Sequence, residues 1–228
     1  MNRSEHRRFF QRYQYELLLV ALVQHLFIGL VLTDMDLYAR VVWPINMILV
    51  GAGSVGVFQE KGKWERRLRN VLFVLVLVLP LSLPFQSDTR GAMLWISVVY
   101  TLFFSFIFVE VMRYLVRPGR IDRDIISAAV CGMLLLIEIA AFGLQGMFYQ
   151  DAATLRGVAA ADPASIYMDL VYFATITIAT IGYGDIAPGT HQAKLAVSLI
   201  GIAGQLYMVV LMGILISKFT NRRTQGPR

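Results

Sequence analysis

The sequence predicts an all-α membrane protein with six transmembrane helices and one re-entrant helix between the fifth and the sixth. Two observations lead to this fold class. The 228 residues are 57% hydrophobic and only 16% charged, which leaves too little polar surface to cover a soluble domain of this size. Apolar runs also recur along the chain, and about 20 residues suffice to cross a bilayer as a helix. The runs lie at 14–33, 41–58, 71–85, 92–116, 125–149 and 191–217.

The third run, 71–85, is the shortest and contains Pro80 and Pro84. At about 1.5 Å per residue it barely spans a bilayer, so we expect it to thin the bilayer locally or to continue into flanking residues. The first run is too long for the apolar part of a signal peptide, and no small-residue cleavage site follows it. It is therefore expected to remain as an anchor.

Basic residues indicate on which side of the membrane each loop lies. If the N-terminus is cytoplasmic, all Lys and Arg residues except Arg40, Arg90, Arg156 and Lys194 fall on the cytoplasmic side. This bias is usual in multi-pass proteins, so it supports six crossings with both termini inside. Because these charges sit at helix ends rather than on one soluble face, the net charge of +6 does not indicate binding to nucleic acid.

Pro118 and Gly119 break the helical pattern after the fourth helix, within the segment 117–124. We therefore expect a four-helix domain at 1–124 and a second domain at 125–228. In the second domain, the apolar segment 165–181 must leave and re-enter the same side of the membrane, because it is too short to cross and return. Non-helical backbone at membrane depth is tolerated where it lines water, so the glycine-rich stretch that follows is expected to line an aqueous path.

That stretch reads "TIATIGYGD" over residues 177–185. Its last six residues, 180–185, resemble the selectivity filter of potassium channels, with Ile181 where valine is commonest. The resemblance firmly covers 125–217, and the six-helix plan of the whole chain gives weaker support for 1–124. It implies a homotetramer around an axial pore, with K⁺ ions in the filter, membrane lipid as surroundings and no other cofactor. It also implies a prokaryotic cytoplasmic membrane, or an internal membrane such as the thylakoid, as the location.

The resemblance assigns roles to individual residues. The backbone carbonyls of residues 180–183 and the Thr180 hydroxyl would replace the water around K⁺. Gly182 and Gly184 supply the positive φ that lets successive carbonyls point the same way. A pore helix at about 166–178 would direct its negative C-terminal end toward the central cavity. The implied ion-binding residues are Thr180, Ile181, Gly182, Tyr183 and Gly184; the filter supports are Asp185, Tyr172, Phe173 and Thr177; and the gating hinge is Gly204, with Gly201 and Gly213 as rivals.

The sequence departs from the voltage-gated members of the family, which carry Arg or Lys at every third position of the fourth helix. Here residues 92–112 contain no basic residue, and Arg117, Arg120 and Arg123 follow the apolar span. We therefore expect a K⁺-selective channel with weak or no voltage dependence. A voltage-gated K⁺ channel using these three arginines, and a non-selective cation channel of the same fold, remain alternatives. The family's frequent pore-helix glutamate is replaced by Ile176.

Four other features need an interpretation. The segment "GAGSVG", 51–56, matches a dinucleotide-binding pattern, but within an apolar helix its small residues are expected to serve close helix packing. His25 is expected to be a packing residue. Glu138 has two open interpretations, an interhelical hydrogen bond or a role in gating. His191 is a candidate proton sensor. No catalytic set or metal-ligand spacing is evident, so we expect no enzymatic activity.

Overall fold

The computed structural model describes residues 13–32, 34, 37–57, 62–82, 89–116, 123–159 and 162–224. Within these ranges each apolar run of the sequence corresponds to a helical segment, as predicted. The N-terminal segments are α2 (Gln14–Phe27), η1 (Ile28–Leu30), η2 (Tyr38–Val42), α4 (Trp43–Val57), α5 (Lys63–Ser82) and α6 (Thr89–Val116). The C-terminal segments are α7 (Arg123–Gln150), η4 (Ala152–Thr154), α8 (Pro163–Ile178) and α9 (His191–Thr224).

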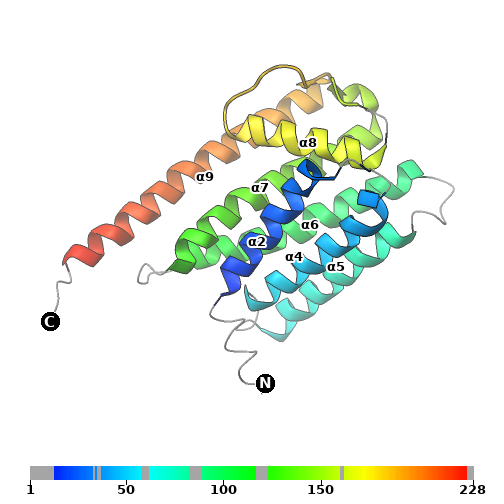
Figure 1. Ribbon diagram of the computed structural model, residues 1–228. Coiled ribbons are helices and arrows are strands. Elements are labelled where there is room, and N and C mark those ends of the chain that lie inside the picture. The colour runs from blue at the N-terminus through cyan, green and yellow to red at the C-terminus, as the bar shows by residue number, and fades with distance from the viewer. Residues whose placement is uncertain are drawn as a thin grey trace.

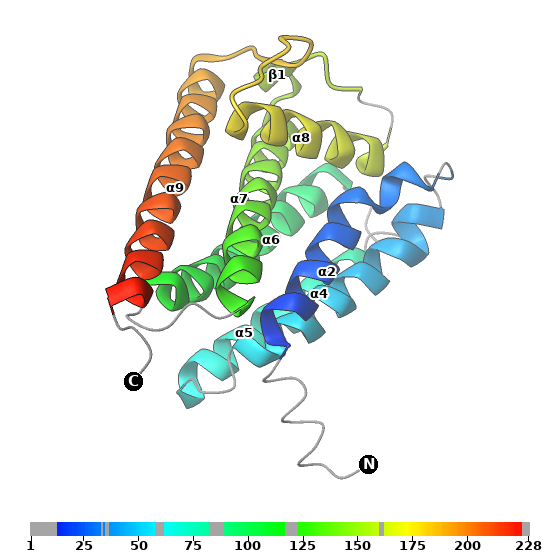
Figure 2. The same ribbon diagram turned by 60° about the vertical axis from the view of Figure 1, so that its left-hand side comes forward.

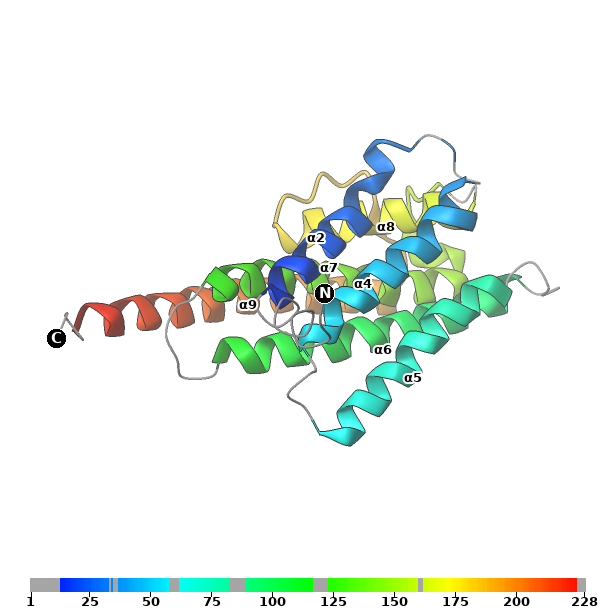
Figure 3. The same ribbon diagram turned by 60° about the horizontal axis from the view of Figure 1, so that its bottom comes forward.

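Helix α7 is the centre of the arrangement. It lies between α6 on one side and α2 and α8 on the other (Figure 3). Helix α4 packs on α2, and α5 packs on α6 (Figure 1). Helix α9 stands apart from α2, α4 and α5, and α8 lies across the end of the bundle next to the start of α9 (Figure 2). The beginning of α2 and the end of α9 both lie at the opposite end.

Helix α5 continues into residues that flank its apolar run. It begins at Lys63, passes through the basic residues that precede the run, and ends at Ser82. Pro80 lies in its last turn and has no N–H, so it cannot donate to the carbonyl of Val76. Tyr100 of α6 donates its hydroxyl to that carbonyl at 3.0 Å. The neighbouring helix thus satisfies the backbone group that the proline leaves free.

Two glycines of the segment 51–56, Gly51 and Gly53, lie in α4 and serve helix packing, as predicted. A Cβ on Gly53 would lie 3.1 Å from the Cα atom of Leu18 and 3.2 Å from the carbonyl oxygen of Leu17, both in α2. A Cβ on Gly51 would clash with the ring of Phe73 in α5. The missing side chains therefore let α4 approach both neighbouring helices closely.

Among the residues that the structure describes, three helical segments are long and apolar enough to cross a membrane: Arg90–Val116, Asp124–Gln150 and His191–Ile216. Two further apolar segments, Gln14–Leu30 and Pro163–Ile178, are shorter. The chain is thus a multi-pass membrane protein. Crossing by the segments before α6, and hence the count of six, stays a prediction.

The fold of the described residues is helical, as predicted, and one small sheet accompanies the helices. Strands β1 (Leu155–Arg156) and β2 (Ala187–Pro188) pair antiparallel, with Leu155 opposite Pro188 and Arg156 opposite Ala187. Two residues per strand are too few to show an alternating pattern in the sequence. The pairing forms because the loop after α7 and the loop before α9 meet above α8 (Figure 2).

Candidate functional site

The candidate site is the segment 180–185, which connects the end of α8 to the loop before α9. Helix α8 begins three residues earlier than the predicted range, because Asp162 caps its N-terminus. The Asp162 carboxylate accepts from the N–H groups of Ala164 and Ser165, each at 2.9 Å, and Pro163 occupies the first helical position. These interactions fix the start of the helix that carries the segment.

The backbone of the segment alternates between two conformations. Thr180, Gly182 and Gly184 have φ angles of +59°, +56° and +82°. Positive φ at the two glycines was predicted, and it carries no steric cost for glycine. Thr180 was not predicted to join them, because a β-branched residue is strained in this region. Strained backbone of this kind persists where surrounding contacts hold it, and it is concentrated at functional sites.

Those contacts come from the last turn of α8. The carbonyl of Ile176 accepts two N–H groups from the segment, that of Ile181 at 2.8 Å and that of Gly182 at 3.3 Å. The carbonyl of Thr177, a predicted filter support, accepts the N–H of Thr180 at 3.1 Å. The end of α8 is therefore bonded directly to the backbone of the segment, and any movement of the helix end is transmitted to it.

At the other end of the segment, Tyr172 donates its hydroxyl to the carboxylate of Asp185 at 2.6 Å. This hydrogen bond lowers the pKa of Asp185 below that of an ordinary aspartate. It links α8 to the last residue of the segment, where Ile176 supplies no carboxyl partner. Two predicted supports thus meet, although the sequence did not indicate this bond. Phe173, the other aromatic residue among the predicted supports, is buried in the core of its own chain.

The side chains of the segment are open to their surroundings in the single chain. Ile181 is 53% exposed and Tyr183 is 72% exposed. Thr180, Gly182, Gly184 and Asp185 are exposed as well. Helix α9 is similarly uncovered, with only 11% of its apolar span buried. The exposed side chains of Ile181, Tyr183 and the apolar span of α9 thus lack, in one chain, the covering that large apolar surfaces ordinarily have.

Gly204 lies where α9 passes the end of α8. A Cβ at this position would lie 2.9 Å from Cγ2 of Ile178 and 3.3 Å from its Cα atom. The rival positions Gly201 and Gly213 have no such neighbour, because a Cβ there would meet nothing within 4 Å. Helix α9 is continuous from His191 to Thr224, so it is not interrupted at Gly204 in this conformation. Gly204 is here a point of close contact between α9 and α8.

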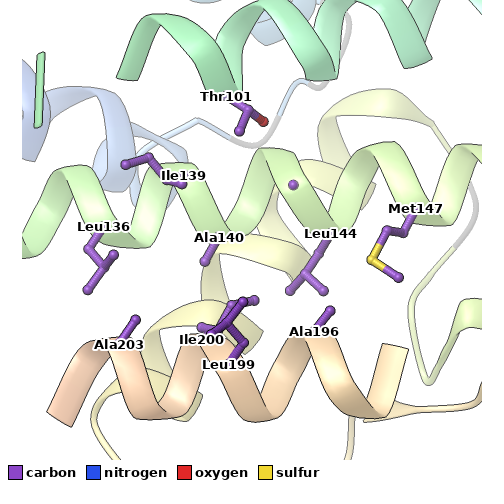
Figure 4. Close-up of a pocket in the computed structure, with 11 residues that line it drawn as sticks. Thr101, Leu136, Ile139, Ala140, Leu144, Met147, Ala196, Leu199, Ile200 and Ala203 are labelled. Atoms are coloured by element: carbon purple, nitrogen blue, oxygen red, sulfur yellow. The ribbon is translucent and has the colours of Figure 1, made fainter. Parts of the chain in front are cut away.

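A cavity of about 330 Å³ lies between α6, α7 and α9 (Figure 4). Side chains from α9, including Ala196, Ile200 and Ala203, face Leu136 and Leu144 of α7 across it. The one hydroxyl in its lining belongs to Thr101, which donates it to the carbonyl of Ser97. The other residues that line it have apolar side chains or none.

The other predicted residues divide into three groups. Glu138 and His25, considered separately in the sequence, lie together in the core with Tyr167 of α8. His191 is exposed at the start of α9. Arg117 and Arg120 lie outside the described residues, as does most of the predicted domain boundary at 117–124, and Arg123 is the first residue of α7.

Comparisons with known proteins agree with this geometry. Residues 132–221, from the middle of α7 to the end of α9, match a family model described as "Ion channel". A segment of 50 residues, 22% of this chain, is 38% identical to the delayed-rectifier potassium channel regulatory subunit KCNS2 of Homo sapiens and covers 10% of it. A segment of 89 residues, 39% of this chain, is 27% identical to two-pore potassium channel 4 of Arabidopsis thaliana and covers 29% of it.

A third relative, potassium voltage-gated channel subfamily A member 7 of Homo sapiens, is 38% identical over 58 residues, which are 24% of this chain and 13% of the relative. The aligned segments thus span less than a third of each relative's length. No solved structure matches the chain. Residues 132–221 of the chain thus match an ion-channel domain, and shorter segments are distantly similar to potassium channels.

Proposed function

We propose that four copies of this chain form a channel that conducts K⁺ selectively through a filter made of residues 180–184. The observation that carries this proposal is the alternation of positive φ at Thr180, Gly182 and Gly184. Such an alternation turns successive carbonyl groups toward one side of the chain, and rings of carbonyls can replace the hydration shell of K⁺. The similarity to proteins named as potassium channels supports the choice of ion.

Two further observations support the assembly and the charge of the ion. One chain supplies one loop, whereas a cage of carbonyl rings requires several loops around an axis. The exposed side chains of Ile181 and Tyr183 and the uncovered face of α9 are surfaces that neighbouring subunits would cover. The filter also starts at the C-terminal end of α8, where the helix dipole is negative and favours a cation.

The test is ion flux through the purified full-length protein in liposomes. We expect K⁺ and Rb⁺ to pass far better than Na⁺, and the purified protein to be a tetramer in detergent. Equal K⁺ and Na⁺ flux would refute the proposed selectivity. A monomeric or dimeric protein with selective flux would refute the proposed assembly.

We expect the current to depend weakly on voltage. Each charge that crosses the full field contributes about 2.3 kcal/mol per 100 mV, so steep gating requires several charges inside the membrane in each subunit. In α6 no basic residue lies between Arg90 and Arg113, and Arg113 pairs with Glu110 at 2.5 Å. The expected voltage dependence is equivalent to about one gating charge or less per subunit.

Recordings of open probability from strongly negative to strongly positive potentials in a planar bilayer measure this quantity. The prediction is wrong if open probability follows a steep sigmoid that flattens when Arg117, Arg120 and Arg123 are neutralised together. That outcome would identify these arginines as a voltage sensor, the alternative function considered from the sequence.

Tyr172→Phe is expected to make the channel more sensitive to external acid. The Tyr172 hydroxyl lowers the pKa of Asp185. The hydrogen bond therefore stabilises the folded structure fully above the ordinary carboxyl pKa, and this stabilisation is lost as pH falls through the lowered pKa of Asp185. Without the hydroxyl the pKa of Asp185 rises, and its protonation begins at a higher pH. K⁺ flux measured against external pH should therefore decline at a higher midpoint in the variant than in the unmodified protein. An unchanged midpoint would show that Asp185 protonation does not limit conduction.

Gly204→Ala is expected to lower open probability while the K⁺/Na⁺ permeability ratio stays unchanged. The reason is that a residue without Cβ allows the inner helix to bend at low cost. Gly213→Ala is the matched control for a helical glycine with open space around it. Single-channel recording gives both quantities. Because the added Cβ also meets Ile178, lost selectivity at unchanged open probability would show that Gly204 seats α9 against α8 rather than acting as a hinge.

A further inference from the structure

Three polar side chains meet in the core where α8 contacts the N-terminal helices: His25 of α2, Glu138 of α7 and Tyr167 of α8. All three are almost fully buried. The Tyr167 hydroxyl lies 3.1 and 3.0 Å from the two carboxyl oxygens of Glu138 and donates to them. Nε2 of His25 lies 3.1 Å from the Tyr167 hydroxyl and 3.4 Å from Oε1 of Glu138. We refer to these three residues as the His–Glu–Tyr cluster.

The hydroxyl of Tyr167 holds the cluster together. It has one hydrogen to donate, which goes to Glu138, and lone pairs that can accept from His25. A His25 tautomer with its proton on Nε2 satisfies this contact, and Nδ1, which has no hydrogen-bond partner among the described residues, is then an acceptor. The cluster therefore uses one oxygen atom to connect three helices.

The surroundings of the cluster extend this connection to the other N-terminal helices. The ring of Tyr167 packs against Trp43 of α4, with centroids 4.8 Å apart, and against Phe142 of α7 at 5.1 Å. The indole N–H of Trp43 donates to the Tyr100 hydroxyl of α6 at 3.0 Å. Tyr100 in turn donates to the Val76 carbonyl of α5. A continuous series of contacts thus runs from α5 through α6 and α4 to α8.

Keeping an acid inside membrane helices is costly, and such residues usually have a function. The close contacts of α8 with α2 and α4 could be made by apolar side chains alone. The end of α8, about 17 Å along the helix from Tyr167, is bonded to the filter backbone through the carbonyl of Ile176. A rotation or shift of α8 at Tyr167 would therefore move the atoms that hold Ile181 and Gly182.

We propose that the His–Glu–Tyr cluster is a positioning site that fixes α8 against the N-terminal helices and thereby maintains the filter geometry. The inference rests on the proposed K⁺ selectivity. Its consequence is that the N-terminal helices act on conduction through the filter itself, by way of His25 and Trp43, in addition to any action on α9. Tyr167 and His25 are in this sense positioning residues that do not touch the ion.

The main test is Tyr167→Phe in the full-length protein, because this change removes one oxygen atom and keeps the ring between Trp43 and Phe142. Tyr207→Phe is the matched control. Tyr207 is also buried, and its hydroxyl donates to the carbonyl of Ala129, away from the cluster. We expect the K⁺/Na⁺ permeability ratio to fall about tenfold in Tyr167→Phe, the size expected for loss of one hydrogen bond to a carboxylate. Tyr207→Phe should keep the ratio, and both variants should assemble as the unmodified protein does.

Two further variants separate the roles within the cluster. Glu138→Gln retains an acceptor for Tyr167 and should keep more selectivity than Glu138→Leu, which retains none. His25→Leu leaves the bond between Tyr167 and Glu138 intact, so it isolates the link to α2 and provides the test if Tyr167→Phe does not assemble. It should lower the permeability ratio in the same direction by a smaller factor.

The proposal is overturned if Tyr167→Phe and His25→Leu keep the permeability ratio of the unmodified protein. It is also overturned if Tyr207→Phe lowers the ratio as much as Tyr167→Phe, because the effect would then reflect general loosening of the domain. An unmodified protein that does not distinguish K⁺ from Na⁺ gives a separate result: the proposed function itself fails, and the inference that rests on it fails as well.

Discussion

Gly184→Ala is expected to abolish discrimination between K⁺ and Na⁺. The φ angle of Gly184 is +82°, and a Cβ there would meet nothing within 4 Å in the single chain. The expected effect therefore comes from the backbone. An alanine in the left-handed region costs about 1–2 kcal/mol, which amounts to about 4–8 kcal/mol when four copies line one filter. Relaxation of this strain would turn backbone carbonyls away from the ion. The filter would then lose the rings of oxygen atoms that replace the water around K⁺.

The matched control is Gly143→Ala. Gly143 lies in α7 with helical backbone, and a Cβ there would also meet nothing within 4 Å. The two variants thus add the same methyl group into open space and differ in the backbone conformation that receives it. Liposome flux assays with K⁺ and Na⁺ should show unchanged selectivity for Gly143→Ala. Retained selectivity in Gly184→Ala would contradict the proposed role of the alternating backbone.

Leu206→Lys is expected to prevent assembly. Apolar residues on α9 recur at alternating spacings of four and three residues, which places them on one face of the helix. Each of them is more than half exposed in the single chain. A lysine in this face would bury an unpaired charge in an apolar interface between subunits, and a tetramer would contain four such charges. The residues of this face are Leu195, Leu199, Ile202, Leu206 and Val209.

The oligomeric state in detergent, measured by light scattering on a size-exclusion column, tests this prediction. Leu206→Met is the control, because it keeps an apolar side chain of similar volume and should leave the tetramer intact. A Leu206→Lys protein that still forms tetramers would show that this face of α9 meets lipid or water rather than another subunit. The filter proposal would then need a different interface.

The positions of the helices follow from local properties of the sequence. Each apolar run became a helical segment because its length and composition favour helix at membrane depth, whatever its neighbours are. The positive φ of Gly182 and Gly184 was predictable for the same reason, since glycine alone adopts this conformation without strain. The small-residue packing at Gly53 was predictable from composition, although its partner, Leu18, was not.

The tertiary structure decided which residues meet. An acid within an apolar helix indicates that Glu138 needs a partner, but His25 and Tyr167 are brought to it only by the packing of α2 and α8 on α7. The closeness of Gly204 to Ile178 likewise depends on where α9 crosses α8. Thr180 adopts positive φ against its own preference, because hydrogen bonds from residues 180–182 to the last turn of α8 fix the backbone there. Sequence patterns report what each segment favours alone, whereas these contacts depend on the relative positions of helices, which no single segment encodes.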